Sequence, residues 1–438
     1  MPAPLLPVPS DLHLPRKVDV VVIGGGIVGV CTAYFLALNK VRVALIEKGR
    51  IGAEQSSRNW GWCRQMNRDK RELALAARSL ALWEQIQADT GKQLGFSRCG
   101  LLYLSDNTAE LENWSSWCAW AVGEGMKTQV LSSKQANDYA GATAKQWQGG
   151  ILSPTDGVAD PSSAAPLIAQ AIQAHGGTIH QFCAARGLES RAGSIHEVIT
   201  EHGRIETEQV VLAGGAWSSS FCRQLGISVP LSSVRSSILA VRPENVELPP
   251  AVHTQDVSVT RRNDGAYTLA ISGLARVDPT PQNLRYMSRF LPMFLSRRSY
   301  LKPGGHQAWF LGHETLSKWD LDKSTPMETT RILDPRPDSR TIDETLRRAR
   351  VLFPDLGTAI VQNAWAGYID STPDGVPVID EIAPGLILAA GMSGHGFGIG
   401  PGVGQMTATL AQGKTPDLPH AGYCLARLHT GKLNVAGV

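Results

Sequence analysis

The chain has 438 residues, of which 43% are hydrophobic and 18% charged, and its formal net charge is +3. This length predicts two or three structural units, and the composition is that of an ordinary globular protein. No clustered Lys/Arg run indicates a nucleic-acid partner, and no apolar run reaches the roughly 18 residues of a membrane-spanning helix, so only peripheral membrane contact stays open.

The seven cysteines are scattered along the chain, without a C-x-x-C pair or a His/Cys cluster at metal spacing. We therefore expect a cytoplasmic protein without a metal site. The proline-rich residues 1–16 resemble neither a signal peptide nor a folded element, and we expect them and residues 416–438 to form tails.

The first nucleotide-binding signal starts at residues 18–23, "VDVVVI", whose β-branched run predicts a strand buried in a parallel sheet. Gly24, Gly26 and Gly29 follow in G-x-G-x-x-G spacing around Ile27 and Val28, and an apolar helical stretch comes next. In such a motif the glycines permit a tight turn, close approach of a pyrophosphate, and close packing of the helix on the sheet. The segment predicts a dinucleotide site.

The next predicted strand, residues 41–47, ends at Glu47, 18 residues after Gly29. An acidic residue there favours a free ribose hydroxyl, hence FAD or NAD rather than NADP. An NAD domain would continue with further βαβ units, but this chain turns to "KGRIGAEQSSRNWGWCRQ", which is polar and rich in Gly and Ser. FAD is therefore favoured.

Two later segments repeat the pattern of a strand that ends in small residues. The strand Val210–Ala213 runs into Gly214, for which a helix-capping turn is the alternative. The strand 386–391 precedes "SGHGFGIGPGVGQ", six glycines around His395, and a helix of small residues. Because glycine costs about 0.5–1 kcal/mol inside an element, we expect this bare backbone to form a loop that seats the isoalloxazine ring.

Five segments in this order, "DVVVIGGGIVGVCTAYFLA", "GAEQSSRNWG", "VVLAGGAWS", "STPDGVPVI" and "GMSGHGFGIGPGVG", resemble the FAD-dependent amino-acid and amine oxidoreductases of the D-amino-acid oxidase superfamily. The resemblance covers residues 17 to about 415, and "EKGRIGAEQS" and "KWDLDKSTPMETTRI" are similar to the flavin L-amino-acid deaminases. It implies an α/β fold with a Rossmann-like FAD domain of the para-hydroxybenzoate-hydroxylase type, at 17–95, 149–230 and 360–415. An interleaved substrate domain with an antiparallel sheet would take residues 96–148 and 231–359.

The motifs and the resemblance together place one set of residues around FAD. The cofactor would be noncovalent, because Gly367 stands near the position of the cysteine that anchors flavin in sarcosine-oxidase-like relatives. Ser56 and Ser57 would donate hydrogen bonds to the pyrophosphate or ring edge, with a structural loop role as the alternative. The set is Gly24, Gly26, Ile27, Val28, Gly29, Glu47, Lys48, Gln55, Ser56, Ser57, Arg58, Asn59, Gly61, Ala213, Gly214, Trp217, Gly391, Gly394, His395, Gly396, Phe397 and Gly398.

The substrate site is less defined, because three positions where relatives carry a carboxylate-binding Arg or Lys hold Ile369, Gly398 and Ser272 here. An Arg fork is the usual partner of a carboxylate. We expect Arg64 to be that partner, between Trp60 and Trp62 as aromatic walls, with Tyr368, Arg235 and Arg276 as further candidates. Each has an alternative as an ion-paired or packing residue. For His395, which the resemblance places beside the flavin, we favour a positioning role over general-base catalysis.

Local signals predict further elements. Residues 71–90 form a helical stripe that ends before Gly91, and Asp160, Pro161 and Gly176 bound another helix. Thr341 and Glu344 have capping-box spacing, and "SSILAV" and "GAYTLAI" alternate like strands.

The implied activity is hydride transfer from the α-carbon of an amino acid to flavin, giving an imine that hydrolyses to a 2-oxo acid and ammonia. Oxidation of a secondary amine, such as an N-alkyl or cyclic imino acid, is an alternative, and so is a flavin-containing subunit without turnover of its own. The electron acceptor would be oxygen or a respiratory quinone or cytochrome. Substrate handedness stays open.

Overall fold

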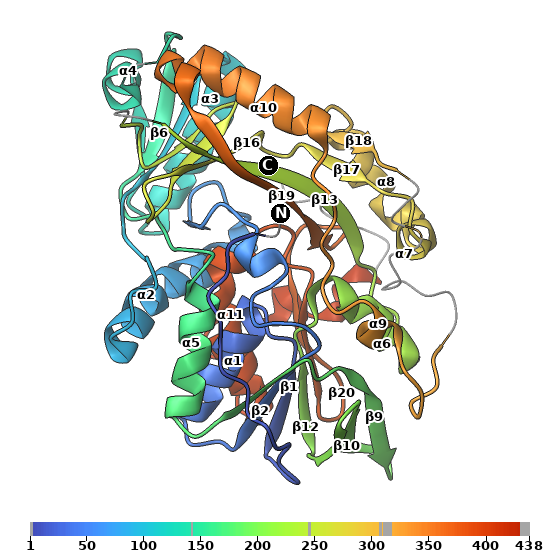
Figure 1. The fold of residues 1–438 in the computed structure, drawn as a ribbon. Coiled ribbons are helices and arrows are strands. Elements are labelled where there is room, and N and C mark those ends of the chain that lie inside the picture. The colour runs from blue at the N-terminus through green and yellow to red at the C-terminus, as the bar shows by residue number, and fades with distance from the viewer. Residues whose placement is uncertain (1–2, 142, 244–246, 306–308, 310–317, 430–438) are drawn as a thin grey trace.

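A computed structural model describes residues 3–141, 143–243, 247–305, 309 and 318–429. It contains two main sheets, one in the lower half of Figure 1 and one in the upper half. Segments from the two ends of the chain meet in the lower half, where α1 (Ile27–Leu38) packs beside α11 (Gly396–Ala411).

The first sheet has six strands in the order β20-β21-β12-β1-β2-β8. All neighbours are parallel except β20 and β21. The strands are β1 (Val20–Ile23), β2 (Val43–Glu47), β8 (Thr178–Gln181), β12 (Gln209–Leu212), β20 (Val378–Ala383) and β21 (Leu386–Ala390).

Alternate residues of β1 enter different cores, as the pleat of a doubly covered strand requires. Val20 and Val22 pack with α1, α11, α2 (Leu73–Thr90) and α5 (Ala164–Ala174). Val21 and Ile23 pack on the other face. That face is covered by α6 (Ser218–Gln224) and a three-stranded sheet of β9 (Ala185–Arg191), β10 (Ser194–Thr200) and β11 (Gly203–Glu206).

The second sheet has ten strands and is largely antiparallel. Its members are β4 (Leu101–Ser105), β5 (Gln129–Leu131), β6 (Gly149–Ser153), β13 (Ser232–Arg242), β14 (Ala251–His253), β15 (Ser258–Arg261), β16 (Tyr267–Ala270), β17 (Ala275–Val277), β18 (Leu301–Pro303) and β19 (Ile360–Ser371). The strand-like piece at 236–241 is confirmed as part of β13, and the piece at 265–271 contains β16.

Helices accompany the second sheet, and α10 (Ser339–Leu352) contributes to its core. The others are α3 (Thr108–Gly123), α4 (Ser133–Ala140), α7 (Pro281–Arg285) and α8 (Met287–Ser296). The short α9 (Pro326–Thr329) lies instead beside α6, where Met327 joins the core of the first sheet. A two-stranded ribbon of β3 (Trp62–Cys63) and β7 (Gly157–Val158) completes the elements used below.

The α/β architecture with an interleaved antiparallel sheet agrees with expectation. The ranges 149–230 and 360–415, however, do not belong wholly to the nucleotide domain, because each begins with a strand of the other sheet. Both β6 and β19 belong to the second sheet. The strand β19 pairs with β13 along nearly its whole length and reaches the first sheet only at its end, where Ser371 bridges to Met392.

The predicted helix over 71–90 is confirmed as α2, which ends at Gly91 in the left-handed conformation (φ 61°). Two predicted starts are wrong. The helix α5 is capped at Ser163, since Asp160 instead accepts the amide of Ser162. The helix α10 is capped by Asp338, and Glu344 pairs with arginines of its own helix.

The glycine-rich stretch is not the loop that the sequence indicated, because α11 already begins at Gly396. A Cβ on Gly400 would lie 2.8 Å from Ile27 Cγ1, and one on Gly404 would lie 2.8 Å from the backbone carbon of Cys31. Gly402 meets the backbone of Leu75 in the same way. These glycines therefore serve the packing of α11 on α1 and α2.

The terminal segments differ from simple tails. Leu6 and Asp11 donate backbone hydrogen bonds to Ser162 and Ile179. Residues 416–429 contain two short 3₁₀ turns, and Tyr423 and Leu428 are buried in the cores. Residues 1–2 and 430–438 lie outside the described residues. Among the described helices, none is both long and apolar enough to span a bilayer.

We expect Gly404→Ala to destabilise the protein by about 1–3 kcal/mol, the usual cost of overpacking a core. Alanine alone would favour the helix by up to about 1 kcal/mol, so the packing clash decides the sign. The midpoint of denaturant unfolding measures the effect. Gly123→Ala is the matched control, because a Cβ there meets no atom within 4 Å; equal midpoints for the two variants would contradict the packing account.

Candidate active site

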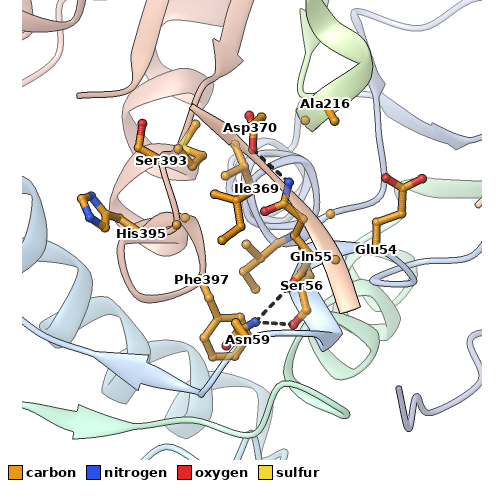
Figure 2. Close-up of a pocket in the computed structure, with 18 of the residues that line it drawn as sticks. Glu54, Gln55, Ser56, Asn59, Ala216, Ile369, Asp370, Ser393, His395 and Phe397 are labelled. Atoms are coloured by element: carbon orange, nitrogen blue, oxygen red, sulfur yellow. Dashed lines mark hydrogen bonds between the residues drawn. The ribbon is translucent and has the colours of Figure 1, made fainter. Parts of the chain in front are cut away.

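A cavity of about 450 Å³ lies where the first sheet meets the second. The carboxyl ends of β1, β2 and β12 contribute Ile23, Glu47 and Leu212, and the second sheet contributes Val234, Ser236 and His253. Ligands of open parallel sheets bind at this edge of the strands. Figure 2 shows one part of the cavity, with Gln55, Ser56 and Asn59 facing Ile369 and Asp370.

The three glycines of the first motif have different reasons for lacking a side chain. Gly24 has φ +111°, and a Cβ on it would overlap the carbonyl oxygen of Ala213. A Cβ on Gly29 would overlap the carbonyl oxygen of Gly24. Gly26 has an ordinary φ of −71°, and a Cβ there would meet only Ser56 Oγ at 3.4 Å. The fold itself therefore tolerates a side chain at Gly26, which lines the cavity, so its bare backbone leaves room for a ligand.

The segment after β2 is fixed by its own hydrogen bonds. Ser56 Oγ accepts the amide of Ile27 at the start of α1 (2.8 Å). Asn59 Nδ2 donates to the carbonyls of Gln55 and Ser56, and its Oδ1 accepts the amide of Gly61 (2.7 Å). The loop therefore holds Gln55, Ser56 and Asn59 rigidly at the cavity wall.

At the expected ribose position, each carboxylate oxygen of Glu47 accepts one backbone amide, from Gly25 and Gly49, both at 2.6 Å. Burial raises the pKa of this carboxyl group. Lys48 lies 3.9 Å from the centroid of the Trp217 ring, and its Nζ contacts Glu54 at 3.0 Å. Glu54 also accepts the indole N–H of Trp217 (3.2 Å). The sequence did not single out Glu54, yet its carboxylate binds both Lys48 and Trp217 at this end of the cavity.

Asp370 joins the loop to the start of the last glycine segment. Its Oδ1 accepts from Gln55 Nε2 (3.1 Å) and its Oδ2 from the amide of Gly391 (2.7 Å), and the first of these bonds is drawn in Figure 2. Burial raises the pKa of this carboxyl group to about 6.

Most of the predicted cofactor residues line the cavity. Four do not, namely Gly29, Ser57, Gly61 and Gly391, and they shape the backbone behind it. The lining members are Gly24, Gly26, Ile27, Val28, Glu47, Lys48, Gln55, Ser56, Arg58, Asn59, Ala213, Gly214, Trp217, Gly394, His395, Gly396, Phe397 and Gly398. Of these, Arg58 is committed to the fold, because its guanidinium donates to the carbonyls of Leu333 and Ala366 and pairs with Asp334.

On the substrate side, Arg64, Trp60 and Trp62 line the cavity together. The two indole rings meet edge to face at 4.9 Å, and the indole N–H of Trp62 donates to Thr260 (2.6 Å). Arg64 uses Nη1 on the carbonyls of Met66 and Asn67. Its other guanidinium nitrogens have no hydrogen bond or ion pair to the described residues, so they are available to an anion.

Arg235, Arg276 and Tyr368 do not line the cavity, which corrects their prediction as substrate residues. Arg235 Nε and the Tyr368 hydroxyl both bind Asp278 Oδ2, at 3.0 and 3.1 Å. Arg276 pairs with the capping residue Asp338 of α10 at 2.8 Å. These polar contacts tie together the strands and helix of the second sheet.

The cavity wall also holds charged residues that the sequence did not single out. Arg68 is 5% exposed and Glu72 is 0% exposed, and both line the cavity near His395. Burial lowers the pKa of Arg68 to about 9. Arg64, Arg68 and Glu72 are four residues apart, but residues 64–69 are not helical, so this spacing did not indicate their common location. The cavity lining further includes His253 and Arg297.

Away from this cavity, the structure brings together Asp380, His420 and Cys424. One potential ligand atom of each lies within 4.8 Å of the others, in partly buried surroundings. This cluster was not expected, because Asp380 is distant in the chain from His420 and Cys424. Asp380 Oδ2 accepts the amide of Leu425 (2.8 Å).

Solved structures of known proteins share this fold. The L-amino acid deaminase of Proteus myxofaciens, in complex with anthranilate, superposes with a TM-score of 0.93 and 25% identity, covering 98% of this chain and 97% of that one. The L-amino acid deaminase of Proteus vulgaris gives 0.91 and 26%, covering 96% and 100%. L-proline dehydrogenase from P. horikoshii gives 0.79 and 25%, covering 96% and 100%.

Similar sequences are also found among characterised enzymes. Glycine oxidase of Geobacillus kaustophilus (strain HTA426) is 25% identical over 96% of this chain and 99% of its own length. Mitochondrial sarcosine dehydrogenase of Mus musculus is 25% identical over 98% of this chain, which spans only 43% of that longer protein. The DAO model, described as FAD dependent oxidoreductase, matches residues 19–410. The expected resemblance and two-domain fold class are thereby confirmed, and the chain belongs to the DAO family of FAD-dependent oxidoreductases.

Proposed function

We propose that this chain oxidises an α-amino acid at its α-carbon, giving an imine that hydrolyses to a 2-oxo acid and ammonia. FAD-dependent oxidation of amino acids or amines is common to its family and its relatives. The observation that carries the narrower proposal is Arg64, a cation with free donors that lines the cavity together with the paired indole rings of Trp60 and Trp62. This arrangement suits a carboxylate attached to an apolar group.

The residues present fit FAD. The cradle at Gly26, the start of α1 and the carboxylate of Glu47 would hold its pyrophosphate and ribose, and the start of α11 would hold the ring. When bound, FAD supplies the hydride acceptor. We propose noncovalent binding. Cys183 is the cysteine among the described residues that line the cavity, and burial raises its pKa to about 11, which disfavours the reactive thiolate.

The chain itself has to position the substrate and exclude water. The Arg64 fork would fix the carboxylate, and Trp60, Trp62 and Tyr103 would surround the side chain. Since these walls are aromatic, we expect apolar or aromatic amino acids to bind best. Holding the α-carbon in a fixed position and orientation is the main contribution of a protein to a reaction whose chemistry the cofactor carries.

A screen of anaerobic flavin bleaching tests the substrate class. We expect at least one apolar α-amino acid to reduce the flavin, because only such a substrate satisfies both Arg64 and the aromatic walls. D-, L- and N-methyl amino acids belong in the screen, since relatives include sarcosine dehydrogenase and glycine oxidase. Reoxidation by oxygen against a quinone analogue or a cytochrome identifies the acceptor. If dithionite reduces the flavin but no amino acid or amine does, the result would contradict the proposal and favour a subunit without turnover of its own.

Gly26→Val tests the cradle. We expect the variant to fold but to lose most of its flavin, because the fold tolerates a Cβ at Gly26 while the branched side chain occupies the ligand space. The flavin-to-protein absorbance ratio measures loading, and the melting temperature of flavin-free protein serves as the folding control. Full flavin content in the variant would refute this use of Gly26.

Arg64→Ala tests the carboxylate fork. We expect substrate affinity to fall by about 10- to 150-fold while flavin content is unchanged, since a hydrogen-bonded charge contributes about 1.5–3 kcal/mol. The substrate concentration that half-saturates flavin reduction is the measurement. Arg347→Ala, on the outer face of α10 and paired with Glu344, is the control. Unaltered affinity in Arg64→Ala would remove this assignment.

A further inference from the structure

Glu72 is a buried carboxylate that the activity described so far does not use. Its side chain is 0% exposed, and neither carboxylate oxygen has a hydrogen-bond partner among the described residues. Its near neighbour is His395, whose Nδ1 lies 3.4 Å from Oε1. An ionised carboxylate without donors is costly to bury, and the neighbouring His395 ring and the charge of Arg68 offset part of that cost.

The two nitrogens of His395 face different surroundings. Nδ1 is buried against Glu72, whereas 26% of the side chain is exposed and the residue lines the cavity. Nε2 has no hydrogen-bond partner among the described residues and is not among their buried unpaired atoms, so it is open to the cavity. In Figure 2 the ring points away from Gln55 and Asn59. The 3.4 Å contact does not align as a hydrogen bond, but the negative charge of Glu72 favours the tautomer with the proton on Nδ1, which leaves the Nε2 lone pair facing a ligand.

Four other charged or titratable groups face this pair. Burial lowers the pKa of His395 to about 4, the charges of Arg68 and Arg64 add to this effect, and Glu72 opposes it. Asp69 is bound to Arg71 (2.9 Å), and the Tyr423 hydroxyl donates to the Arg71 carbonyl (2.6 Å), so both are otherwise engaged. The imidazole is consequently neutral near pH 7 when no ligand is bound.

We propose that His395 and Glu72 form a dyad that removes a proton from the substrate's ammonium group. This inference rests on the proposed oxidation of an α-amino acid. An N–H bond of the ammonium breaks, a new N–H bond forms at His395 Nε2, and the electron pair remains on the substrate nitrogen. The resulting neutral amine can then support loss of hydride from its α-carbon. Glu72 does not touch the substrate and acts as a positioning residue, which fixes the ring and stabilises the imidazolium.

The substrate's carboxylate would favour this transfer. Burial is the main reason for the low proton affinity of His395, and the charges of Arg68 and Arg64 lower it further as long as they are unopposed. A carboxylate bound at Arg64 opposes them, so the imidazole binds a proton more readily in the complex than in the free protein. An amine without a carboxylate would lack this effect. The dyad thereby links recognition of an amino acid to its activation.

The pH dependence of anaerobic flavin reduction tests the dyad. In Glu72→Gln and His395→Asn we expect the rate at neutral pH to fall by about 10²–10⁴-fold, the usual contribution of a general base. Above the pKa of the substrate's ammonium group, where the free amine is supplied, the variants should approach the original rate. Glu72→Asp should retain part of the neutral-pH rate, because it keeps the carboxylate.

A merely structural role for Glu72 would lower the rate equally at every pH, and that result would overturn the inference. Unchanged profiles in both variants would also overturn it. If no amino acid reduces the flavin of the unaltered enzyme, that result would instead refute the proposed function itself. Flavin content of each variant, measured by absorbance, separates lost chemistry from lost cofactor.

Proton uptake gives a readout independent of turnover. We expect binding of benzoate, a carboxylate without an amine, to take up protons between pH 4 and 7. The sign follows because a pKa that rises on binding leaves the complex with more bound protons than the free protein over that interval. Calorimetry in buffers of different ionisation enthalpy measures the uptake. It should disappear in His395→Asn and persist in His196→Asn, whose histidine does not line the cavity; equal uptake in both variants would argue against the dyad.

Discussion

The close packing of α1 against α11 is the constraint on which the site depends. The two helices come from opposite ends of the chain, and they touch because Gly400 and Gly404 expose bare backbone to Ile27 and Cys31. Both helices begin at the cavity, α1 after Gly26 and α11 after His395. Their contact therefore fixes the distance between the half of the cavity suited to a nucleotide and the half suited to a reacting group.

This contact also explains what the sequence could and could not reveal about the glycines. The first motif was interpretable residue by residue, because the order of strand, glycines and helix has few structural solutions. For residues 393–405 we correctly expected bare backbone, but we expected all of it to face a ligand. A sequence does not distinguish backbone that faces a cofactor from backbone that faces another helix. Only Gly394, Gly396 and Gly398 of its six glycines line the cavity.

Charged residues were harder to place for a physical reason. Arg64 was identifiable from adjacent tryptophans, but Arg235 and Arg276 are equally compatible with ion pairs, and Asp278 and Asp338 supply these. The partners lie 43 and 62 residues away in the chain, beyond any local pattern. Glu72 and His395, which are in contact, are separated by more than 300 residues, so no spacing rule connects them.

Electrostatics at the cavity wall therefore constrains the chemistry more strongly than any single motif. The wall places Arg64 and Arg68 beside an imidazole and a buried carboxylate, and Arg68 is itself buried. Charges in such surroundings interact more strongly than in water. A zwitterionic ligand would meet free cationic donors at Arg64 and a proton acceptor at His395. A ligand of one charge only would leave one part of the wall uncompensated.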